Sequence, residues 1–304
     1  MRSESAVAAN DSGLTSFVVV AADSGSLLGD CVDSVLAVAD ALELVLVDNA
    51  SGDGSIERVL DAHAQDARLR LLRNPANLGF GPACNRGAAI ARGDVLVFLN
   101  PDCIAPRDLA VRLRATLASD PRLGVLGVQV TDPDGTPARG NRRREPTLRR
   151  ALATLSGLAR LESRWPALQG VEMPPAPEGD LETVEAVSGA CLVLPRIAFE
   201  RVGGFDEGYF LHAEDLDLCR RVRDAGLRVA IDARVRVAHA QGGSSRSRPL
   251  FVARHKHRGL WRYFTKFDPA ARNPLLRAVV WLGLWLHFAA LAPINAWRQV
   301  RAAA

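Results

Sequence analysis

Acidic and amide side chains follow two apolar segments of the sequence, at the point where each segment ends. Asp48 follows residues 42–47, and Asn100 and Asp102 follow residues 95–99. In an open parallel sheet, the carboxyl ends of the strands line the ligand crevice. A carboxylate there can accept hydrogen bonds from a ribose or a base, or can bind a divalent cation that bridges diphosphate oxygens. Asp and Asn also commonly form turns after strands, so either position alone is weak evidence. The prediction of a ligand site depends on both positions together.

Three more acids, Glu214, Asp215 and Asp217, fall in the first turn of a helix predicted over residues 213–225. The helix dipole stabilises an acid there by about 0.3 to 1 kcal/mol, which explains one or two of them. A carboxylate at the edge of a cleft can also remove the proton of an attacking hydroxyl, and we expect Asp215 to be that base. His239 ends a predicted strand and has two interpretations: a ligand of a metal or phosphate, or a structural residue.

A glycine-rich turn, NPANLGFGPACNRG, lies between the first two acidic positions. Gly79 and Gly81 permit close approach of the backbone, and a helix beginning near Pro82 offers free N–H groups to an anion. The turn matches neither GxGxxG nor a P-loop. The sequence therefore lacks the fingerprints of a Rossmann dehydrogenase and of a phosphate-binding NTPase.

The elements that must position these residues alternate between apolar strands and helical stretches, which predicts an α/β fold with a mostly parallel central sheet flanked by helices. The predicted strands cover residues 17–22, 42–47, 69–72, 95–99, 123–130, 184–194 and 228–239. The predicted helices cover residues 82–91, 106–119 and 213–225, and residues 131–146 are expected to form a loop. The strand at residues 95–99 is apolar without alternation, so both of its faces should be covered.

Composition excludes several classes of protein. With 38 basic and 34 acidic residues the net charge is only +4, so no nucleic-acid partner is expected. The five cysteines are scattered and form no CxxC pair, which indicates neither a disulfide framework nor a zinc cluster and fits a reducing cytoplasm. The 48% hydrophobic content is enough for a buried core.

The C-terminal region is different in character. Residues 278–297 are nearly all apolar, so they are expected to span a membrane, to lie on it, or to form a buried core helix. In the preceding residues 245–267, basic and aromatic side chains alternate at helical spacing. This pattern is typical of a helix at a membrane surface, and equally of a basic helix whose aromatic side chains pack on the domain. The basic stretch at residues 139–150 would either meet a phosphate of a substrate or remain solvated. Residues 1–14 are expected to be a flexible leader.

The order of these motifs resembles the family 2 glycosyltransferases of GT-A fold, and within them the rhamnosyltransferase-like enzymes that build bacterial cell-surface polysaccharides. The resemblance covers about residues 17–267. It rests on VDNASGDGS, NLGFGPACNRG, LNPD, SGACLVLPR, GGFDEGYFLHAEDLDLCRR and HAQGGSS. It implies a GT-A domain over residues 15–245, followed by a helical, membrane-associated region over residues 246–304.

The resemblance also implies roles for single residues. Asp215 matches the catalytic base, and Glu214 its neighbour. A divalent ion, Mg²⁺ or Mn²⁺, would be held by Asp102, Asn100 and His239. Donor sugar and acceptor would be approached by Ser188, Gly189 and Ala190. The residues implied to bind the nucleotide or donor are Ala21, Asp23, Asp48, Asn77, Gly79, Asn85, Asn100 and Asp102.

The implied activity is inverting transfer of a sugar from a TDP- or UDP-linked donor to a lipid-linked or polysaccharide acceptor. Similarity to the rhamnosyltransferase-like branch implies that this sugar is rhamnose. The enzyme would be cytoplasmic, peripheral to or anchored at the inner membrane, with an anionic membrane surface as a partner. Two departures matter: Ala21, Ala22 and Asp23 replace a Thr-Tyr-Asn-like triplet, and Asn100 replaces the first Asp of the metal motif. They leave open an inactive sugar-nucleotide-binding or scaffold subunit of the same fold. A nucleotidyltransferase would need a basic, glycine-rich N-terminal signature that is absent.

Overall fold

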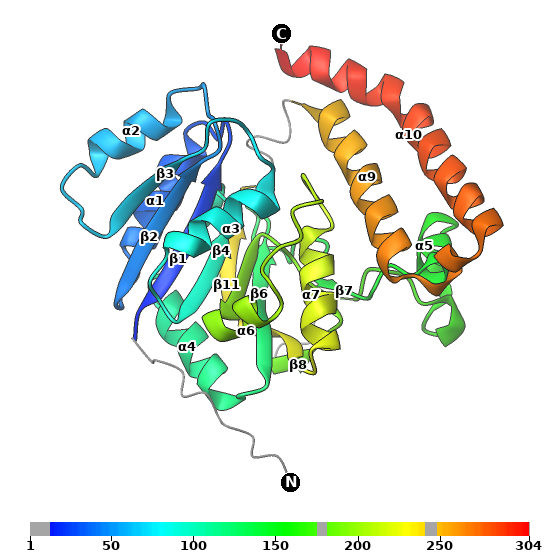
Figure 1. Cartoon of the computed structure of the whole chain (residues 1–304), viewed down its shortest axis with the longest axis horizontal. Coiled ribbons are helices and arrows are strands. Elements are labelled where there is room, and N and C mark those ends of the chain that lie inside the picture. The colour runs from blue at the N-terminus through cyan, green and yellow to red at the C-terminus, as the bar shows by residue number, and fades with distance from the viewer. Residues whose placement is uncertain (1–12, 175–180, 241–247, 304) are drawn as a thin grey trace.

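The computed structural model describes residues 13–174, 181–240 and 248–303. A nine-stranded sheet forms its centre, in the order β3-β2-β1-β4-β10-β6-β11-β5, with β8 paired to β11 (Figure 1). A small second sheet pairs β7 with β9. The strands are β1 (Thr15–Ala21), β2 (Leu42–Asp48), β3 (Leu69–Arg73), β4 (Val95–Leu99), β5 (Cys103–Ile104), β6 (Leu123–Thr131), β7 (Arg142–Arg143), β8 (Leu181–Thr183), β9 (Ala186–Val187), β10 (Cys191–Pro195) and β11 (Arg228–His239).

Helices cover both faces of the large sheet. The core on one face includes α1, α2 and α4, and the core on the other includes α3, α6, α7 and part of α9. The helices are α1 (Leu27–Leu36), α2 (Ser55–Ala62), α3 (Phe80–Ile90), α4 (Leu109–Ser119), α5 (Leu148–Leu155), α6 (Arg196–Arg201), α7 (Glu214–Asp224), α9 (Pro249–Phe267) and α10 (Pro274–Ala303), with short 3₁₀ helices η1 (Leu158–Leu161), η2 (Pro166–Leu168) and η3 (Pro269–Arg272).

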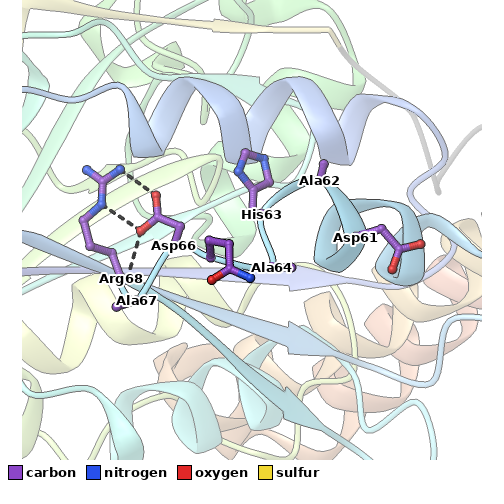
Figure 2. Close-up of a pocket in the computed structure, with 8 residues that line it drawn as sticks. Asp61, Ala62, His63, Ala64, Asp66, Ala67 and Arg68 are labelled. Atoms are coloured by element: carbon purple, nitrogen blue, oxygen red, sulfur yellow. Dashed lines mark hydrogen bonds and ion pairs between the residues drawn. The ribbon is translucent and has the colours of Figure 1, made fainter.

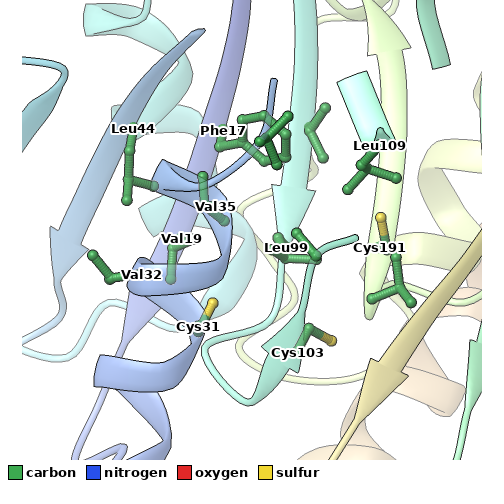
Figure 3. Close-up of a cluster of buried hydrophobic side chains, with 14 of the residues drawn as sticks. Phe17, Val19, Cys31, Val32, Val35, Leu44, Leu99, Cys103, Leu109 and Cys191 are labelled. Carbon is green, nitrogen blue, oxygen red and sulfur yellow. The ribbon is translucent and has the colours of Figure 1, made fainter. Parts of the chain in front are cut away.

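Strand β1 explains why the predicted strands are apolar without alternation. Phe17 and Val19 pack into one core and Val18 and Val20 into the other, because successive side chains of a strand point to opposite faces. Figure 3 shows the first of these cores, in which Cys31 of α1 lies among the same apolar side chains. The expected α/β architecture with two covered faces is confirmed.

The predicted strand at residues 184–194 is wrong as a single element. It divides into β9 and β10, which are separated by a turn at residues 188–190. Strand β10 runs antiparallel between β4 and β6, with Leu192 opposite both Phe98 and Gly127, so the sheet is mixed. The predicted loop at residues 131–146 also contains β7, which pairs with β9.

The C-terminal region is a pair of helices. Helix α9 buries Tyr263 and Phe264 against the domain, as the packed-helix interpretation predicts. Helix α10 packs along α9 and is otherwise exposed to solvent. Its segment Pro274–Trp297 has a mean hydropathy of 1.7 and is long and apolar enough to cross a membrane, and 0% of this segment is buried. The alternative of a buried core helix is therefore wrong. The leader lies mostly outside the described residues, as does the segment at 241–247 after His239.

Candidate active site

The ends of β4 and β11 bring the three predicted metal ligands together. Strand β5 pairs with the end of β11, so that Cys103 lies opposite His239 and Asp102 lies next to it. Nε2 of His239 is 3.0 Å from Oδ1 of Asp102 and 3.5 Å from Nδ2 of Asn100. Residues from two motifs that are 137 positions apart in sequence thus form one cluster.

The donor atoms of this cluster fit a divalent cation. Those of Asp102, Cys103 and His239 lie within 4.8 Å of one another. Burial raises the pKa of the Cys103 thiol well above its usual range, and its Sγ contacts the carbonyl of Ala190 at 3.5 Å. The predicted ligands Asp102 and His239 offer one carboxylate and one imidazole, and ligation by the amide of Asn100 stays a prediction. Mn²⁺ accepts both, and Mg²⁺ would be held mainly through the carboxylate.

The predicted base, Asp215, lies in the first turn of α7 and is almost fully buried. Its Oδ2 accepts a hydrogen bond from the backbone N–H of Gly189 at 3.0 Å and forms an ion pair with Arg143 of β7. Its Oδ1 accepts from the N–H of Leu216 at 2.8 Å. The orientation of the carboxylate is therefore fixed by groups from three separate segments.

The turn at residues 188–190 joins the two acidic centres. The carbonyl of Ala190 accepts from the N–H of Asn100 at 2.9 Å, and the N–H of Gly189 donates to Asp215. A Cβ atom at Gly189 would lie 3.2 Å from Oδ2 of Asp215, so only a small residue fits there without displacing the carboxylate. The segment predicted to meet donor sugar and acceptor thus lies between the predicted metal site and the predicted base.

Glu214 differs from its neighbour. Burial raises the pKa of Glu214 well above its usual range, and the negative charge of Asp215 acts in the same direction. Its Oε2 has no hydrogen-bond partner among the described residues. Burial and the neighbouring charge thus favour the protonated form of Glu214, whereas Asp215 has Arg143 as an ion-pair partner.

The loops after β1 and β2 lie at the same edge of the sheet as the end of β4, because these strands are parallel. Oδ1 of Asp48 accepts from the N–H of Ser51 at 2.8 Å, and Arg73 lies 3.4 Å from its Oδ2. Oδ1 of Asp23 accepts from the N–H of Gly52 at 2.8 Å. Both carboxylates were predicted to bind nucleotide: Asp23 also ties the loop after β1 to the loop after β2, and Asp48 stabilises its own loop.

Asn49 was missed by the sequence analysis, although it directly follows Asp48. Its backbone N–H donates to the carbonyl of Ala21 at 2.8 Å, and its Nδ2 donates to Oδ1 of Asn77 at 2.9 Å. Asn77 therefore supports the glycine-rich turn through Asn49. Within that turn Gly79 has φ +91°, and a Cβ there would lie 2.5 Å from the carbonyl oxygen of Phe210, so this position requires glycine.

The side chain of Asn85 is hydrogen-bonded to the backbone of Phe205. Its Nδ2 donates to the carbonyl of Phe205 at 2.9 Å, and its Oδ1 accepts from the N–H of Phe205 at 2.8 Å. The amide therefore ties α3 to the turn that precedes α7. Its contact with a nucleotide stays a prediction, and such a contact would have to replace one of these bonds.

Residues with strained backbone lie close in sequence to the candidate site residues. Among the described residues, the non-glycine residues with positive φ are Asp23, Ala50, His212 and Ala213. The first two follow β1 and β2, and the other two immediately precede Glu214. Left-handed conformations of such residues cost about 1–3 kcal/mol each and tend to occur at functional sites.

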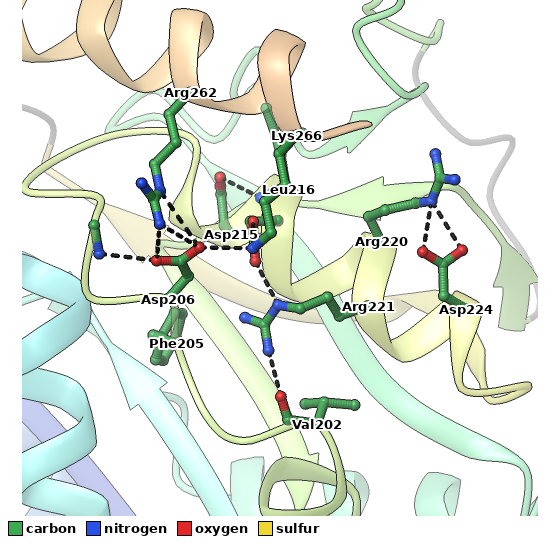
Figure 4. Close-up of polar contacts among 12 residues, drawn as sticks. Val202, Phe205, Asp206, Asp215, Leu216, Arg220, Arg221, Asp224, Arg262 and Lys266 are labelled. Atoms are coloured by element: carbon green, nitrogen blue, oxygen red, sulfur yellow. Dashed lines mark hydrogen bonds and ion pairs between the residues drawn. The ribbon is translucent and has the colours of Figure 1, made fainter. Parts of the chain in front are cut away.

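Helix α9 holds the loop before α7 in place (Figure 4). Arg262 and Lys266 both bind Asp206, at 2.7 and 2.6 Å, and Lys266 also binds Asp217 at 2.6 Å. Gly259 packs so closely that a Cβ there would lie 2.5 Å from the carbonyl oxygen of His212. The loop that precedes the predicted base is therefore held by a helix that the sequence analysis placed outside the domain.

The basic stretch at residues 139–150 is largely neutralised within the chain. The ion pairs that it forms are Arg139–Glu172, Arg142–Glu182, Arg143–Asp215, Arg144–Glu162 and Arg150–Glu185. These acidic partners lower the net charge of the stretch, and a contact between its arginines and a substrate phosphate stays a prediction.

A surface hollow lies at the turn between α2 and β3 (Figure 2). Asp66 and Arg68 line it and pair with each other at 2.7 Å. None of the predicted site residues borders this hollow. The strand ends described above therefore remain the candidate site.

Comparison with known proteins agrees with this geometry. Residues 16–169 match the family model described as glycosyl transferase family 2. The N-acetylglucosaminyl-diphospho-decaprenol L-rhamnosyltransferase of Mycobacterium tuberculosis is 31% identical over 250 residues, which cover 75% of this chain and 79% of that protein. The O-antigen biosynthesis protein RfbC of Myxococcus xanthus is 29% identical over 239 residues, or 76% of this chain and 18% of that protein.

Solved structures show the same fold. A mannosyltransferase from Pyrobaculum calidifontis, in complex with GDP-Man and Mn²⁺, aligns over 95% of this chain and 74% of its own, with a TM-score of 0.56 and 21% identity. GalNAc-T7 with UDP, GalNAc and Mn²⁺ aligns over 74% of this chain and 43% of its own, with a TM-score of 0.56 and 19% identity. The expected GT-A fold is confirmed, and the chain belongs to glycosyltransferase family 2.

Proposed function

We propose that this chain is an inverting glycosyltransferase that moves a sugar from a nucleoside diphosphate to a lipid-linked acceptor in cell-surface glycan synthesis. The observation that carries the proposal is the turn at residues 188–190, which has Asp102 and His239 near one end and Asp215 at the other. A reaction that needs a leaving diphosphate and an attacking hydroxyl needs two such centres on either side of the anomeric carbon. The similarity to the mycobacterial rhamnosyltransferase supports the lipid-linked acceptor.

The donor is proposed to lie along the strand ends, with its nucleotide against the loops of Asp23 and Asp48. The diphosphate would lie next to Asn100 and Asp102. Asp102 and His239 would hold Mn²⁺ or Mg²⁺, which when bound neutralises charge on the leaving diphosphate. Rhamnose is the proposed sugar, on a TDP- or UDP-linked donor.

Asp215 is proposed to act as the base. A carboxylate has about four lone-pair sites, and three are occupied by Gly189, Arg143 and Leu216, so one site on Oδ1 remains for the acceptor hydroxyl. As the acceptor oxygen bonds to the anomeric carbon, the bond from that carbon to the diphosphate breaks and the hydroxyl proton passes to Asp215. No covalent intermediate is needed. Arg143 and Gly189 act as positioning groups for the carboxylate.

The enzyme is proposed to work at the cytoplasmic face of the membrane. Helix α10 supports this, because it is apolar, exposed, and long enough to meet a bilayer.

Thermal stabilisation by TDP, UDP and GDP, each with and without Mn²⁺, tests the donor site, since a ligand that binds the native state raises its melting temperature. We expect one nucleotide to stabilise the protein, and more so with Mn²⁺. Asp215→Asn should keep that shift and lose sugar transfer, whereas Asp102→Asn should lose the Mn²⁺-dependent part. Turnover that persists in Asp215→Asn would refute the base, and a folded wild type that no nucleotide stabilises would favour the scaffold-subunit alternative.

A further inference from the structure

Exposed apolar side chains are concentrated in two segments of the molecule. Of the large hydrophobic residues exposed in the described chain, most lie in α10 or between residues 152 and 165. All five tryptophans of the chain also lie in or next to these segments, at positions 165, 261, 281, 285 and 297. Tryptophan favours the boundary between hydrocarbon and water. The distribution therefore points to a surface that meets a membrane rather than to scattered exposed residues.

The first segment runs from α5 through η1 to Trp165. Leu152, Leu155, Leu158 and Leu161 recur at every third position, and each is at least 45% exposed. Trp165 is 58% exposed. These side chains form an apolar edge that contributes little to the core, since of α5 only Ala153 is buried.

The second segment is the open side of α10. Leu275, Val279, Leu282 and Leu286 follow one another at spacings of four, three and four, which places them in one stripe along the helix. All four are more than half exposed. This stripe faces away from α9, whose side of the contact includes His257, bonded to His287 at 3.0 Å.

The two segments meet at one place in the fold. The N–H of Leu148, the first residue of α5, donates to Oδ2 of Asp268 at 2.6 Å. Asp268 lies between α9 and η3, and α10 begins six residues later at Pro274. Figure 1 shows α5 near the first turns of α10. Segments more than a hundred residues apart in sequence are thus joined at the corner between α9 and α10.

Positive charge accompanies the apolar surface. Arg160 and Arg164 lie between the exposed leucines and Trp165, are exposed, and form no ion pair within the described part of the chain. Arg254, Lys256 and Arg258 on α9 are likewise exposed, with no ion pair to another described residue. In the adjoining stretch at residues 139–150, by contrast, five arginines are paired with acids. The exposed cations near the apolar surface complement anionic headgroups.

The same cations argue against α10 crossing the bilayer. Helix α9 runs along α10 and is itself fixed to the catalytic loop through Arg262 and Lys266. Insertion of α10 across the membrane would carry the neighbouring charges of Arg254, Lys256 and Arg258 into hydrocarbon, which is strongly unfavourable. An orientation parallel to the surface buries the open stripe and leaves the cations among headgroups.

We infer that residues 148–168 and α10 form one interfacial surface that binds an anionic lipid bilayer without spanning it. This deepens the membrane part of the proposed function and rests on it. The segment at residues 148–168 is thus a second membrane-binding element, separate from the apolar C-terminal helix. The surface would hold the enzyme where a lipid-linked acceptor enters.

Flotation of the full-length protein with phosphatidylcholine vesicles, with and without 30% phosphatidylglycerol, tests the inference. Leu155→Ser combined with Leu158→Ser should weaken partition into anionic vesicles about tenfold or more, because two exposed leucines no longer insert. The matched control, Val111→Ser combined with Ile197→Ser, removes two similarly exposed apolar side chains elsewhere and should change partition less than twofold. Brominated lipids should quench wild-type fluorescence more than that of Trp165→Phe.

Three results would overturn the inference. One is unchanged partition of the leucine variant with equal quenching in Trp165→Phe. Another is equal binding to neutral and anionic vesicles. The third is loss of self-association in the leucine variant with no loss of vesicle binding, since the edge would then pair with a second copy. Nucleotide-dependent melting and transfer to a soluble short-chain acceptor, measured in the same variants, show that they are folded. They also test the proposed function independently of the membrane.

Discussion

Substitution of Gly259 tests how α9 positions the loop before α7. In Gly259→Ala, the added methyl group would lie 2.5 Å from the carbonyl oxygen of His212 and 3.4 Å from Cβ of Ala213. Because both are held at positive φ immediately before Glu214, the loop has little freedom to yield. Helix α9 must move away instead, or the loop must shift.

The size of the effect follows from two opposing terms. Overpacking of this kind costs about 1–3 kcal/mol, whereas replacing glycine by alanine in a helix gains about 0.5–1 kcal/mol. We expect a net loss of about 1–2 kcal/mol, which lowers the melting temperature by roughly 2–6 °C. Displacement of the loop that leads into α7 would also shift Asp215 in the first turn of that helix, and should lower kcat by about ten- to a hundredfold, as misplacement by about 1 Å can do.

Gly283 in α10 supplies the matched control. It also lies inside a helix, but a Cβ there would meet nothing within 4 Å. Gly283→Ala should therefore stabilise the protein by about 0.5–1 kcal/mol and leave kcat unchanged. Differential scanning fluorimetry and steady-state kinetics measure both variants. A Gly259→Ala protein as stable as the wild type would refute the close contact, and a destabilised one with unchanged kcat would refute the positioning of the loop by α9.

Three further predictions concern charged residues. His239→Ala should abolish the Mn²⁺-dependent part of nucleotide stabilisation in thermal melts, as Asp102→Asn should, whereas an effect of neither would remove this cluster as the metal site. Arg143→Gln should destabilise the fold by about 3–5 kcal/mol in chemical denaturation, because it leaves the buried carboxylate of Asp215 unpaired, and adding Asp215→Asn should recover part of the loss. Burial alone would raise the pKa of Glu43, but hydrogen bonds from Ser16, Arg92 and Arg70 lower it to about 2. A carboxyl group whose pKa is lowered on folding stabilises the fold at pH values above its ordinary pKa of 4.5, and this stabilisation is lost as the pH falls towards 2. Glu43→Gln should therefore lower the free energy of unfolding by about 3 kcal/mol at pH 7, and should make stability depend less on pH between pH 5 and 2.

The parts of the site that the sequence predicts are those fixed by local pattern. Asp48 and Asp102 follow apolar strands, and parallel strands place such ends at one edge, so their arrangement follows from the chain order. Asp215 lies in the first turn of α7, a helix that the sequence predicts from its apolar face and its acidic first turn. The fold class follows from the same alternation of strands and helices.

What the sequence does not predict depends on long-range pairing. Strand β10 is apolar throughout, and such a strand reads the same whether it runs parallel or antiparallel, so the mixed sheet could not be anticipated. Arg143 stands among several arginines, and only the pairing of β7 with β9 distinguishes it. Gly259 resembles any helical glycine until the loop that it contacts is known.

The buried thiols have a consequence for the chemistry of the molecule. Cys31, Cys103 and Cys191 lie in the core together, and Cys84 and Cys219 are also buried. Burial raises the pKa of each of these thiols, which suppresses the reactive thiolate. The folded protein should therefore resist alkylation and air oxidation without a reductant. The reduced state of its cysteines therefore reflects their burial in the core more than the redox state of the compartment in which the protein works. A single cysteine introduced at the surface would be selectively labelled.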